Sequence, residues 1–474
     1  MTLTTEGKGG ATPRWTARLA EAAAAPVDGT SLAAVRIAVG AVVVLSAVRT
    51  WAYGWTDSLY AGTTHRFTYL GLGWVPQPGP FAIRALVAAT AVAGIAIALG
   101  WRTRLAFAVL LVSFGWIELI DVTTYLNHYW FVTLVAVLGL VVPFGTAWSL
   151  DARRAARRGR PPGTVAAGWV WLLRFQVGLV YASAGLAKLH GDWLLRALPL
   201  RFWLPARRDL AVIGPLLEPA ATAHVAAIAG AAFDCLVVPA LLWRRTRPFA
   251  WAAVVAFHVI TWALFPIGVF PWLMIAMATV FFEPAWPRDL LRWARARLGQ
   301  RASPSPATPA APDTPAAPVA LAVPRRRATA TALVAGCWVL VMLALPLRHL
   351  AYPGDHRWTG EGYRFGWNVL LVERVASVTF LVHDPASGRT WTADPSVLYT
   401  EAQLRAMRSE PDLIHQAAIA IADDEAGRGH PGVEVRVDAW MSFNGRPAAR
   451  WIDPEVDLAA EPRSPWHKPW IIGG

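Results

Sequence analysis

The sequence contains very little lysine, cysteine or charge of any kind. Only three of its 44 basic residues are lysines, Lys8, Lys188 and Lys468, and the remaining 41 are arginines. The two cysteines, Cys235 and Cys337, are too few for a disulfide framework or a cysteine metal site. Charged residues make up 16% of the 474 positions and hydrophobic residues 55%, which excludes an ordinary soluble protein and indicates a membrane protein with several spans.

Apolar runs of about 20 residues predict nine membrane-spanning helices. The eighth run is short, is flanked by Pro266 and Pro284 and contains Pro271, so we expect that helix to be broken or tilted. The first 30 residues lack the apolar core of a cleavable signal peptide, so the first run should remain as a helix. The nine runs lie near residues 31–50, 81–100, 105–124, 129–149, 165–189, 216–243, 247–265, 268–283 and 329–350.

The distribution of charge predicts how these helices are oriented. The first 354 residues carry a net charge of +18, and the rest of the chain carries −5. Much of the positive charge lies in the short loops after the second, fourth, sixth and eighth runs, which therefore face the cytoplasm with the N-terminus. This pattern indicates membrane orientation rather than nucleic-acid binding. One outer loop is also basic and is expected to pack on headgroups or cover a site; its arginines are Arg196, Arg201, Arg207 and Arg208.

The predicted fold is a polytopic α-helical membrane bundle with a C-terminal extracytoplasmic α+β domain. Strand-like stretches occur at 375–382, 433–443 and 448–452, with a hairpin signal at Asn444-Gly445 and a helix at 401–423 that is interrupted near Pro411. The predicted segments are a cytoplasmic N-terminus (1–30), a multi-helix membrane domain (31–300), a Pro/Ala-rich cytoplasmic linker (301–328), the last membrane helix (329–350) and the extracytoplasmic domain (351–474).

Lys188 is the candidate for chemistry, because it falls at the outer end of the fifth span in a chain that otherwise uses arginine. A desolvated lysine can act as a neutral amine base, which arginine cannot. The alternative is a lysine that anchors the helix end at the membrane interface. Asn127, His128 and His258 fall at a similar depth, which favours a common site, although either histidine alone could be a buried residue bonded to a backbone carbonyl.

Some of the other charged residues in or near the spans are expected to form ion pairs within the bundle, although the sequence does not show which residue pairs with which. No spacing of histidines and carboxylates resembles a zinc site, so no metal is expected. Phosphate-binding glycine loops and serine-elbow motifs are also absent from the sequence. The charged residues concerned are Arg36, Glu118, Asp121, Arg174 and Asp234.

Several motifs resemble those of the vitamin K-dependent γ-carboxylases. The stretch from Tyr181 to Trp193 is similar to that family's Y-x-x-A-G-x-x-K-L-x-x-D-W segment, with Ala187 where animal members have a second lysine. The Asn127-His128 pair, residues 257–270 and residues 284–288 resemble its N-H, F-H-x(5)-L-F-x-I-G-x-F and P-x-W-P-R elements. The resemblance covers most of the chain and is that of a bacterial homologue with a horizontally transferred transmembrane (HTTM) domain. Matching positions in the C-terminal domain are Gly362-Tyr363, Trp367, Trp440, Ser442 and 453–457.

The resemblance implies an enzyme that oxidises a reduced naphthoquinone, menaquinol or phylloquinol, with O2 to its epoxide. The strong base formed in that reaction would remove a γ-proton from a glutamyl side chain, to which CO2 then adds. Lys188 is implied as the catalytic base, and Asn127, His128 and His258 as residues that bind the quinol cofactor. The implied partners are the lipid bilayer of a bacterial-type plasma membrane, the naphthoquinol and a glutamate-containing protein or peptide.

Two other functions are compatible with the sequence. The protein could epoxidise a quinol without carboxylating any protein. It could instead be a non-catalytic membrane protein that binds or moves a lipid or quinone. The lysine retained at position 188 argues against the non-catalytic function.

Overall fold

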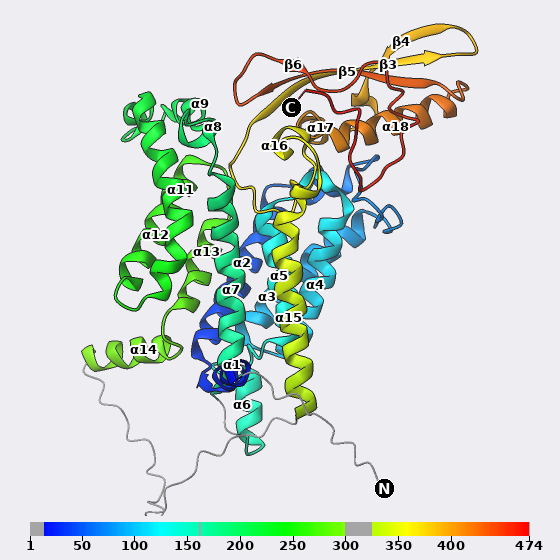
Figure 1. The fold of residues 1–474 in the computed structure, drawn as a ribbon. Coiled ribbons are helices and arrows are strands. Elements are labelled where there is room, and N and C mark those ends of the chain that lie inside the picture. Colours follow the sequence, from blue (N-terminus) through cyan, green and yellow to red (C-terminus); the bar gives the residue numbers. More distant parts are fainter. Residues whose placement is uncertain (1–13, 161–162, 299–324, 474) are drawn as a thin grey trace, which may run out of the picture.

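The computed structural model describes residues 14–160, 163–298 and 325–473, and it has a helical bundle with a sheet-containing domain at one end (Figure 1). Two apolar helices are short, α5 (Asn127–Val141) and α13 (Phe270–Ala278), the latter followed by a 3-10 turn at Thr279–Phe281. Together with seven longer helices they coincide with the nine predicted runs, which confirms the predicted fold class. The seven that are long and apolar enough to cross a membrane are α2 (Thr30–Ala52), α3 (Pro80–Leu99), α4 (Thr103–Ile120), α7 (Ala167–Ala187), α11 (Ala220–Leu242), α12 (Arg247–Leu264) and α15 (Arg325–Leu347).

The eighth span was expected to be broken or tilted, and α13 is short. Pro271 does not break α13, because it lies in the first turn, where the missing N–H of proline costs nothing. The helix is delimited instead by Gly268, which has a φ of +61°, and by the extended backbone at Phe282. Its N-terminus consequently lies below the end of the bundle that carries the C-terminal domain (Figure 1).

Arginine-rich segments from the predicted cytoplasmic loops lie at the end of the bundle opposite the C-terminal domain (Figure 1). They include α6 (Leu150–Arg157) and α14 (Trp286–Arg297), beside an unpredicted N-terminal helix, α1 (Arg14–Ala24). Strand β1 (Pro26–Asp28) pairs with β2 (Thr164–Ala166) at this end, which was also not predicted. Most of the predicted linker lies outside the described residues.

The expectation that some of the intramembrane charges form ion pairs is confirmed for Asp234, which pairs with Lys188, whereas the two arginines are satisfied by backbone carbonyls. The fully buried Arg36 donates to the carbonyls of Ile97 and Ala98, each at 2.6 Å, and to that of Trp148 at 2.7 Å. Arg174 likewise donates to carbonyls after α13, including that of Val280 at 3.0 Å. The last carbonyls of a helix have no intrahelical donor, so they satisfy a guanidinium without any carboxylate.

The C-terminal domain has a four-stranded antiparallel sheet, two longer helices and the short helix α16 (His356–Thr359). The strand order is β4 (Arg389–Ala393), β3 (Arg374–Asp384), β5 (Glu434–Phe443) and β6 (Ala449–Arg450). Asn444 and Gly445 have φ values of +51° and +71° in the predicted hairpin between β5 and β6. The predicted interruption at Pro411 separates α17 (Glu401–Met407) from α18 (Pro411–Gly427). Strand β4 was missed, and β6 is shorter than predicted.

This domain shares a hydrophobic core with the outer loops of the bundle. Phe67, in the loop after α2, is fully buried and stacks on Tyr399 with ring centroids 4.3 Å apart. Val122, just after α4, joins the same cluster. Burial of these apolar side chains fixes the domain on the end of the bundle.

Candidate active site

Lys188 ends α7 and is buried, with 6% of the residue exposed. Tyr181, Ala184 and Lys188 are three and four residues apart, so they lie on one face of the helix. This face borders a cavity of about 450 Å3 between α7, α11, α12 and α13. The cavity lining is mostly apolar, and Lys188, Asp234 and His258 are its main polar members.

The Lys188 ammonium is paired with a carboxylate that sequence reasoning did not assign to it. Its Nζ lies 2.8 Å from Oδ2 of Asp234 on α11, and both side chains are buried. Nζ also donates to the carbonyl of Ala184 at 3.2 Å and lies 5.3 Å from the ring centre of Trp193. Partners of this kind offset the cost of desolvating the ammonium.

Gly185 is what allows α11 to approach Lys188. A Cβ added to this glycine would come within 2.9 Å of the backbone nitrogen of Cys235 and 3.0 Å of the carbonyl carbon of Asp234. A larger residue would therefore push α11 away and lengthen the contact between Lys188 and Asp234. The A-G-x-x-K spacing thus has a steric reason in this fold.

His258 faces the same cavity from α12. Its Nε2 lies 2.9 Å from the hydroxyl of Tyr181, and the His258 side chain is 3% exposed. This hydrogen bond fixes the imidazole against α7, about two helical turns from Lys188 on the same face. The structure thus brings Lys188 and His258 to one cavity, with Tyr181 and Asp234 as two partners that the sequence analysis had not paired with them.

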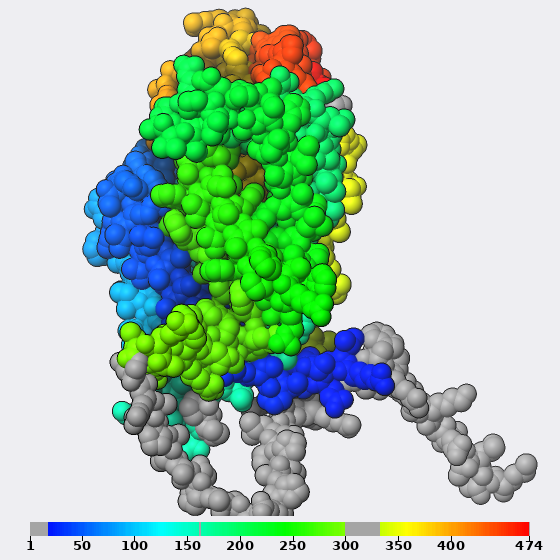
Figure 2. Space-filling model, turned by 90° about the vertical axis from the view of Figure 1, so that its left-hand side faces the viewer, coloured from blue at the N-terminus to red at the C-terminus, as the bar shows by residue number. Residues whose placement is uncertain are grey.

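The cavity is reached through the face formed by α11 and α12. Small residues line this side, namely Ala226 and Ala229 of α11 and Ala253 and Ala256 of α12. Figure 2 shows that the molecular surface is hollowed on this face, below the outer loop. An apolar molecule dissolved in a bilayer would have lateral access to the cavity through this opening.

The basic outer loop between α7 and α11 covers the cavity, which was one of its two predicted roles. It contains the short helices α8 (Gly191–Leu194), α9 (Leu200–Trp203) and α10 (Gly214–Leu217). Trp193, Leu200 and Leu204 line the cavity from above. The loop is tied to the C-terminal domain, because Asp192 accepts hydrogen bonds from Asn444 (3.3 Å) and Arg446.

A segment of the C-terminal domain, residues 362–372, inserts into the same end of the bundle, and we call it the wedge. Trp367 is 1% exposed and packs on Phe131 of α5, with ring centroids 6.0 Å apart. Phe365, Trp367 and Leu370 all have φ values between +50° and +60°. Such strained residues persist only where the surroundings hold them, and they gather at functional sites. Val369 and Leu370 complete the cavity wall.

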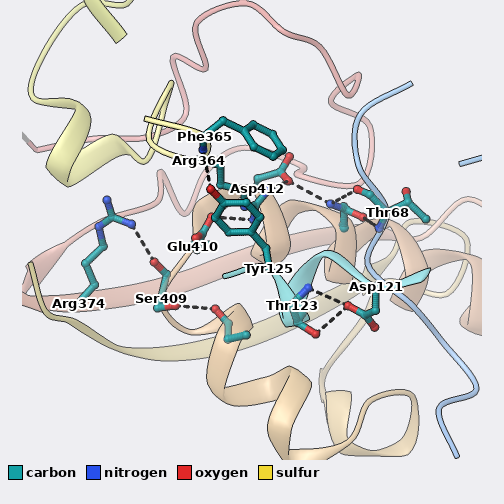
Figure 3. A network of polar contacts seen from close by, with 12 residues as sticks. Thr68, Asp121, Thr123, Tyr125, Arg364, Phe365, Arg374, Ser409, Glu410 and Asp412 are labelled. Atoms are coloured by element: carbon teal, nitrogen blue, oxygen red, sulfur yellow. Dashed lines mark hydrogen bonds and ion pairs between the residues drawn. The ribbon is translucent and has the colours of Figure 1, made fainter. Parts of the chain in front are cut away.

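Polar contacts hold the wedge in place (Figure 3). The hydroxyl of Tyr125, just before α5, accepts from the backbone N–H of Phe365 at 2.9 Å. Arg364 lies 2.7 Å from Glu410 and 3.5 Å from Asp412 at the start of α18. The wedge is therefore fastened to both domains.

Asn127 and His128 lie in an adjoining cavity of about 240 Å3 rather than beside Lys188. The ring of Phe270 stands between the two histidines, with its centroid 5.7 Å from that of His128 and 6.2 Å from that of His258. Asn127 accepts from the hydroxyl of Tyr125 and donates to the carbonyl of Asn368 in the wedge. The two cavities share the walls made by Ile267, Phe270, Val369 and Leu370.

Comparison with known families gives two matches that together cover most of the chain. A model of the HTTM domain matches residues 24–286, more than half of the chain, and a model of the vitamin K-dependent gamma-carboxylase, lumenal domain, matches residues 327–473. The chain belongs to the vitamin K-dependent γ-carboxylase family. In this family member, the HTTM match supplies the helices that carry Lys188 and both histidines, and the lumenal-domain match supplies the wedge. No solved structure gives a significant match to the chain.

Proposed function

We propose that this γ-carboxylase-like membrane protein oxidises a reduced naphthoquinone with O2 to the epoxide and uses the base so formed to carboxylate glutamyl side chains. One observation carries the proposal. A lysine with a carboxylate partner is buried in an apolar cavity that opens between two membrane helices. A buried base of this kind is needed to deprotonate a quinol hydroxyl group that arrives from the bilayer. Water must also be excluded from the place where the base reacts.

The cavity suits a naphthoquinol in size and polarity. Its volume of about 450 Å3 lies within the range of pockets that enclose small aromatic ligands. The stacked rings of Phe233 and Phe257, 4.1 Å apart, provide aromatic surface beside His258. A long isoprenoid tail could remain in the lipid outside α11 and α12 while the ring occupies the cavity.

We assign the proton acceptor role to the Lys188–Asp234 pair. As a neutral amine, Lys188 takes the proton of a quinol hydroxyl: the O–H bond breaks and an N–H bond forms. Asp234, 2.8 Å away, is placed to take a proton from the lysine, so the amine is produced without moving charge through the apolar cavity. His258 and its partner Tyr181 are assigned to hold the other polar end of the quinol.

The overall reaction then balances without a metal or nucleotide. Quinol, O2, CO2 and a glutamyl γ-C–H give quinone epoxide, water and γ-carboxyglutamate. When bound, the quinol supplies the four electrons that reduce O2 as it becomes the quinone epoxide, with one oxygen atom going to the epoxide and the other to water, and it supplies the base that removes the γ-proton. The chain's own residues bind, orient and deprotonate it, while the outer loop and the wedge cover the cavity. Asn127 and His128 are included as contacts for the reactants beyond Phe270.

The test is to incubate the purified full-length protein in lipid nanodiscs with menaquinol or phylloquinol and O2, and to measure epoxide by chromatography. A parallel incubation contains a glutamyl peptide and labelled bicarbonate, so that incorporated CO2 can be counted. Epoxide formation that is lost in His258→Ala supports the proposal. Epoxide without CO2 incorporation would reduce it to a quinol epoxidase, and no epoxide from the wild-type protein would refute it.

A further inference from the structure

The second cavity has the character of an anion site. It lies where the outer ends of α2, α5 and α13 meet under the wedge, and its volume is about 240 Å3. Arg49, Asn127 and His128 are among its lining residues, and none of the lining residues is acidic. Its polar groups therefore favour a negative ligand.

Arg49 supplies a positive charge that has no carboxylate partner in the described part of the chain. It belongs to the last turn of α2, and its guanidinium lies 5.7 Å from the ring centre of Tyr53 and 5.4 Å from that of Trp55. Arg36, Arg174 and Arg247 of the membrane domain, by contrast, donate to backbone carbonyls. A guanidinium that is held by aromatic rings keeps its N–H groups free for a ligand.

Gly268 leaves a space between Arg49 and His128. It has a φ of +61°, and a Cβ added there would lie 3.1 Å from Nη1 of Arg49 and 3.9 Å from Nε2 of His128. Both nitrogens therefore border the same small volume. Neither ring nitrogen of His128 has a hydrogen-bond partner among the residues that the structure describes, so His128 too is free to bind a ligand.

Two helix N-termini reinforce the positive character of this cavity. Helix α5 begins at Asn127 and α13 begins at Phe270, and residues of both first turns line the cavity. The free backbone N–H groups and the positive ends of both helix dipoles favour an anion there. This contribution adds to that of Arg49, which stands on a third helix.

We propose that Arg49 and His128 bind the side-chain carboxylate of the glutamyl residue that is to be carboxylated. The inference rests on the proposed function. A planar guanidinium can form two parallel hydrogen bonds with a carboxylate. The imidazole of His128 contacts the same carboxylate from the other side of the space at Gly268. Because this cavity shares the walls Phe270 and Leu370 with the Lys188 cavity, a carboxylate bound here places its γ-carbon toward the quinol.

This assignment changes the roles expected from the sequence. The two histidines bind different reactants: His258 contacts the quinol, and His128 contacts the glutamyl side chain. Asn127 acts as a positioning residue, since its side chain fastens the start of α5 to Tyr125 and to the wedge. The strained wedge forms a wall of both cavities, so it sets the distance between the two reactants.

The experiment measures binding, not turnover, so that it stands apart from the test of the proposed function. Two fluorescent pentapeptides that differ only by Glu or Gln at the central position are titrated into the full-length protein in nanodiscs. The wild-type protein should bind the Glu peptide more tightly than the Gln peptide. In Arg49→Gln the affinity for the Glu peptide should fall roughly tenfold to a hundredfold, as expected for the loss of a charged hydrogen bond, and the preference for Glu should disappear.

Arg84→Gln is the matched control, because Arg84 is an exposed arginine near the same end of the bundle and pairs with Asp57. It should bind both peptides as the wild type does, and thermal unfolding should show that both variants are folded. Wild-type protein that does not distinguish Glu from Gln, or an Arg49→Gln variant that still does, would overturn the proposal. A competition experiment with sodium bicarbonate distinguishes a glutamyl carboxylate from bicarbonate as the bound anion. Bicarbonate binding without any preference for the Glu peptide would also overturn the proposal.

Discussion

At residue 188, lysine and arginine differ in the one property that the proposed chemistry uses. Both side chains can reach Asp234 and keep an ion pair, but a guanidinium stays protonated at any ordinary pH. Lys188→Arg should therefore fold and yet lose quinol oxidation, by more than a hundredfold on the general scale of a lost general base. Epoxide formation per mole of folded protein is the measurement.

A chemical rescue serves as the control for this variant. Small amines added to Lys188→Ala should restore part of the turnover, with a pH dependence that follows the pKa of the added amine. An arginine variant with full activity would mean that Lys188 only anchors the end of α7.

Asp234 should matter for stability as well as for chemistry. Asp234→Asn leaves a buried ammonium without its carboxylate, which generally costs about 3–5 kcal/mol. Thermal unfolding in detergent should therefore show a clear fall in Tm. The double variant Lys188→Met with Asp234→Leu should recover much of that stability while having no quinol turnover. Equal Tm values for the wild type and Asp234→Asn would contradict a structural ion pair.

At the scale of elements, the sequence predicted the membrane helices well because lipid requires about 20 apolar residues in each span. It located Lys188 and His258 at one depth for the same reason. It could not predict the partner Asp234, because α11 is apolar on all sides and its rotation is set by contact with Gly185. Backbone carbonyls that satisfy Arg36 have no sequence pattern at all.

Sequence patterns were also weaker in the C-terminal domain. Strand β4 is only five residues long and lies at the edge of the sheet, so little of it is buried and its periodicity is faint. The wedge has no regular pattern, because its shape depends on contacts with both domains. The separation of the two histidines by Phe270 depends on how α12 and α13 are joined, which spacing alone does not encode.

Asp457 illustrates a structural role at the element scale. Its Oδ1 accepts from the backbone N–H of Val435 at the start of β5 (2.9 Å) and from that of Ala459 (3.1 Å). Asp457→Ala should remove both bonds and lower stability by about 1–2 kcal/mol, measured by thermal unfolding. Asp453→Ala should cost less, because Asp453 Oδ1 bonds only to Glu455 N–H. Glu455→Ala is the exposed control and should leave Tm unchanged.

At the scale of the whole molecule, neutral histidines near the domain junction should make the protein sensitive to acid. Burial, followed by the positive charges of His349 and others, lowers the pKa of His356 to about 4, and burial likewise lowers the pKa of His190 to about 4. The unfolded chain thus binds more protons, so stability is complete above about pH 6.5 and is lost as the pH falls toward 4.

The measurement is Tm of the full-length protein at pH 7.5 and pH 5. A His356→Gln variant should lose several degrees less than the wild type between these two values, because glutamine does not titrate. A variant whose Tm falls as far as that of the wild type would exclude His356 as a source of the acid sensitivity.

The charge distribution and the nine predicted spans together predict the orientation of the molecule. The arginine-rich α6 and α14 lie at the end opposite the C-terminal domain, and nine spans would place the two chain ends on opposite sides of a membrane. An alkaline phosphatase reporter fused after Gly474 should therefore be active outside the cytoplasm, and a fluorescent reporter inserted within residues 302–324 should report a cytoplasmic site. Replacing the arginines of α14 with glutamate should weaken the preference for this orientation, whereas Lys468→Gln should leave it unchanged. Two reporters on the same side would contradict the nine-span arrangement and, with it, the placement of Lys188 at the outer end of its helix.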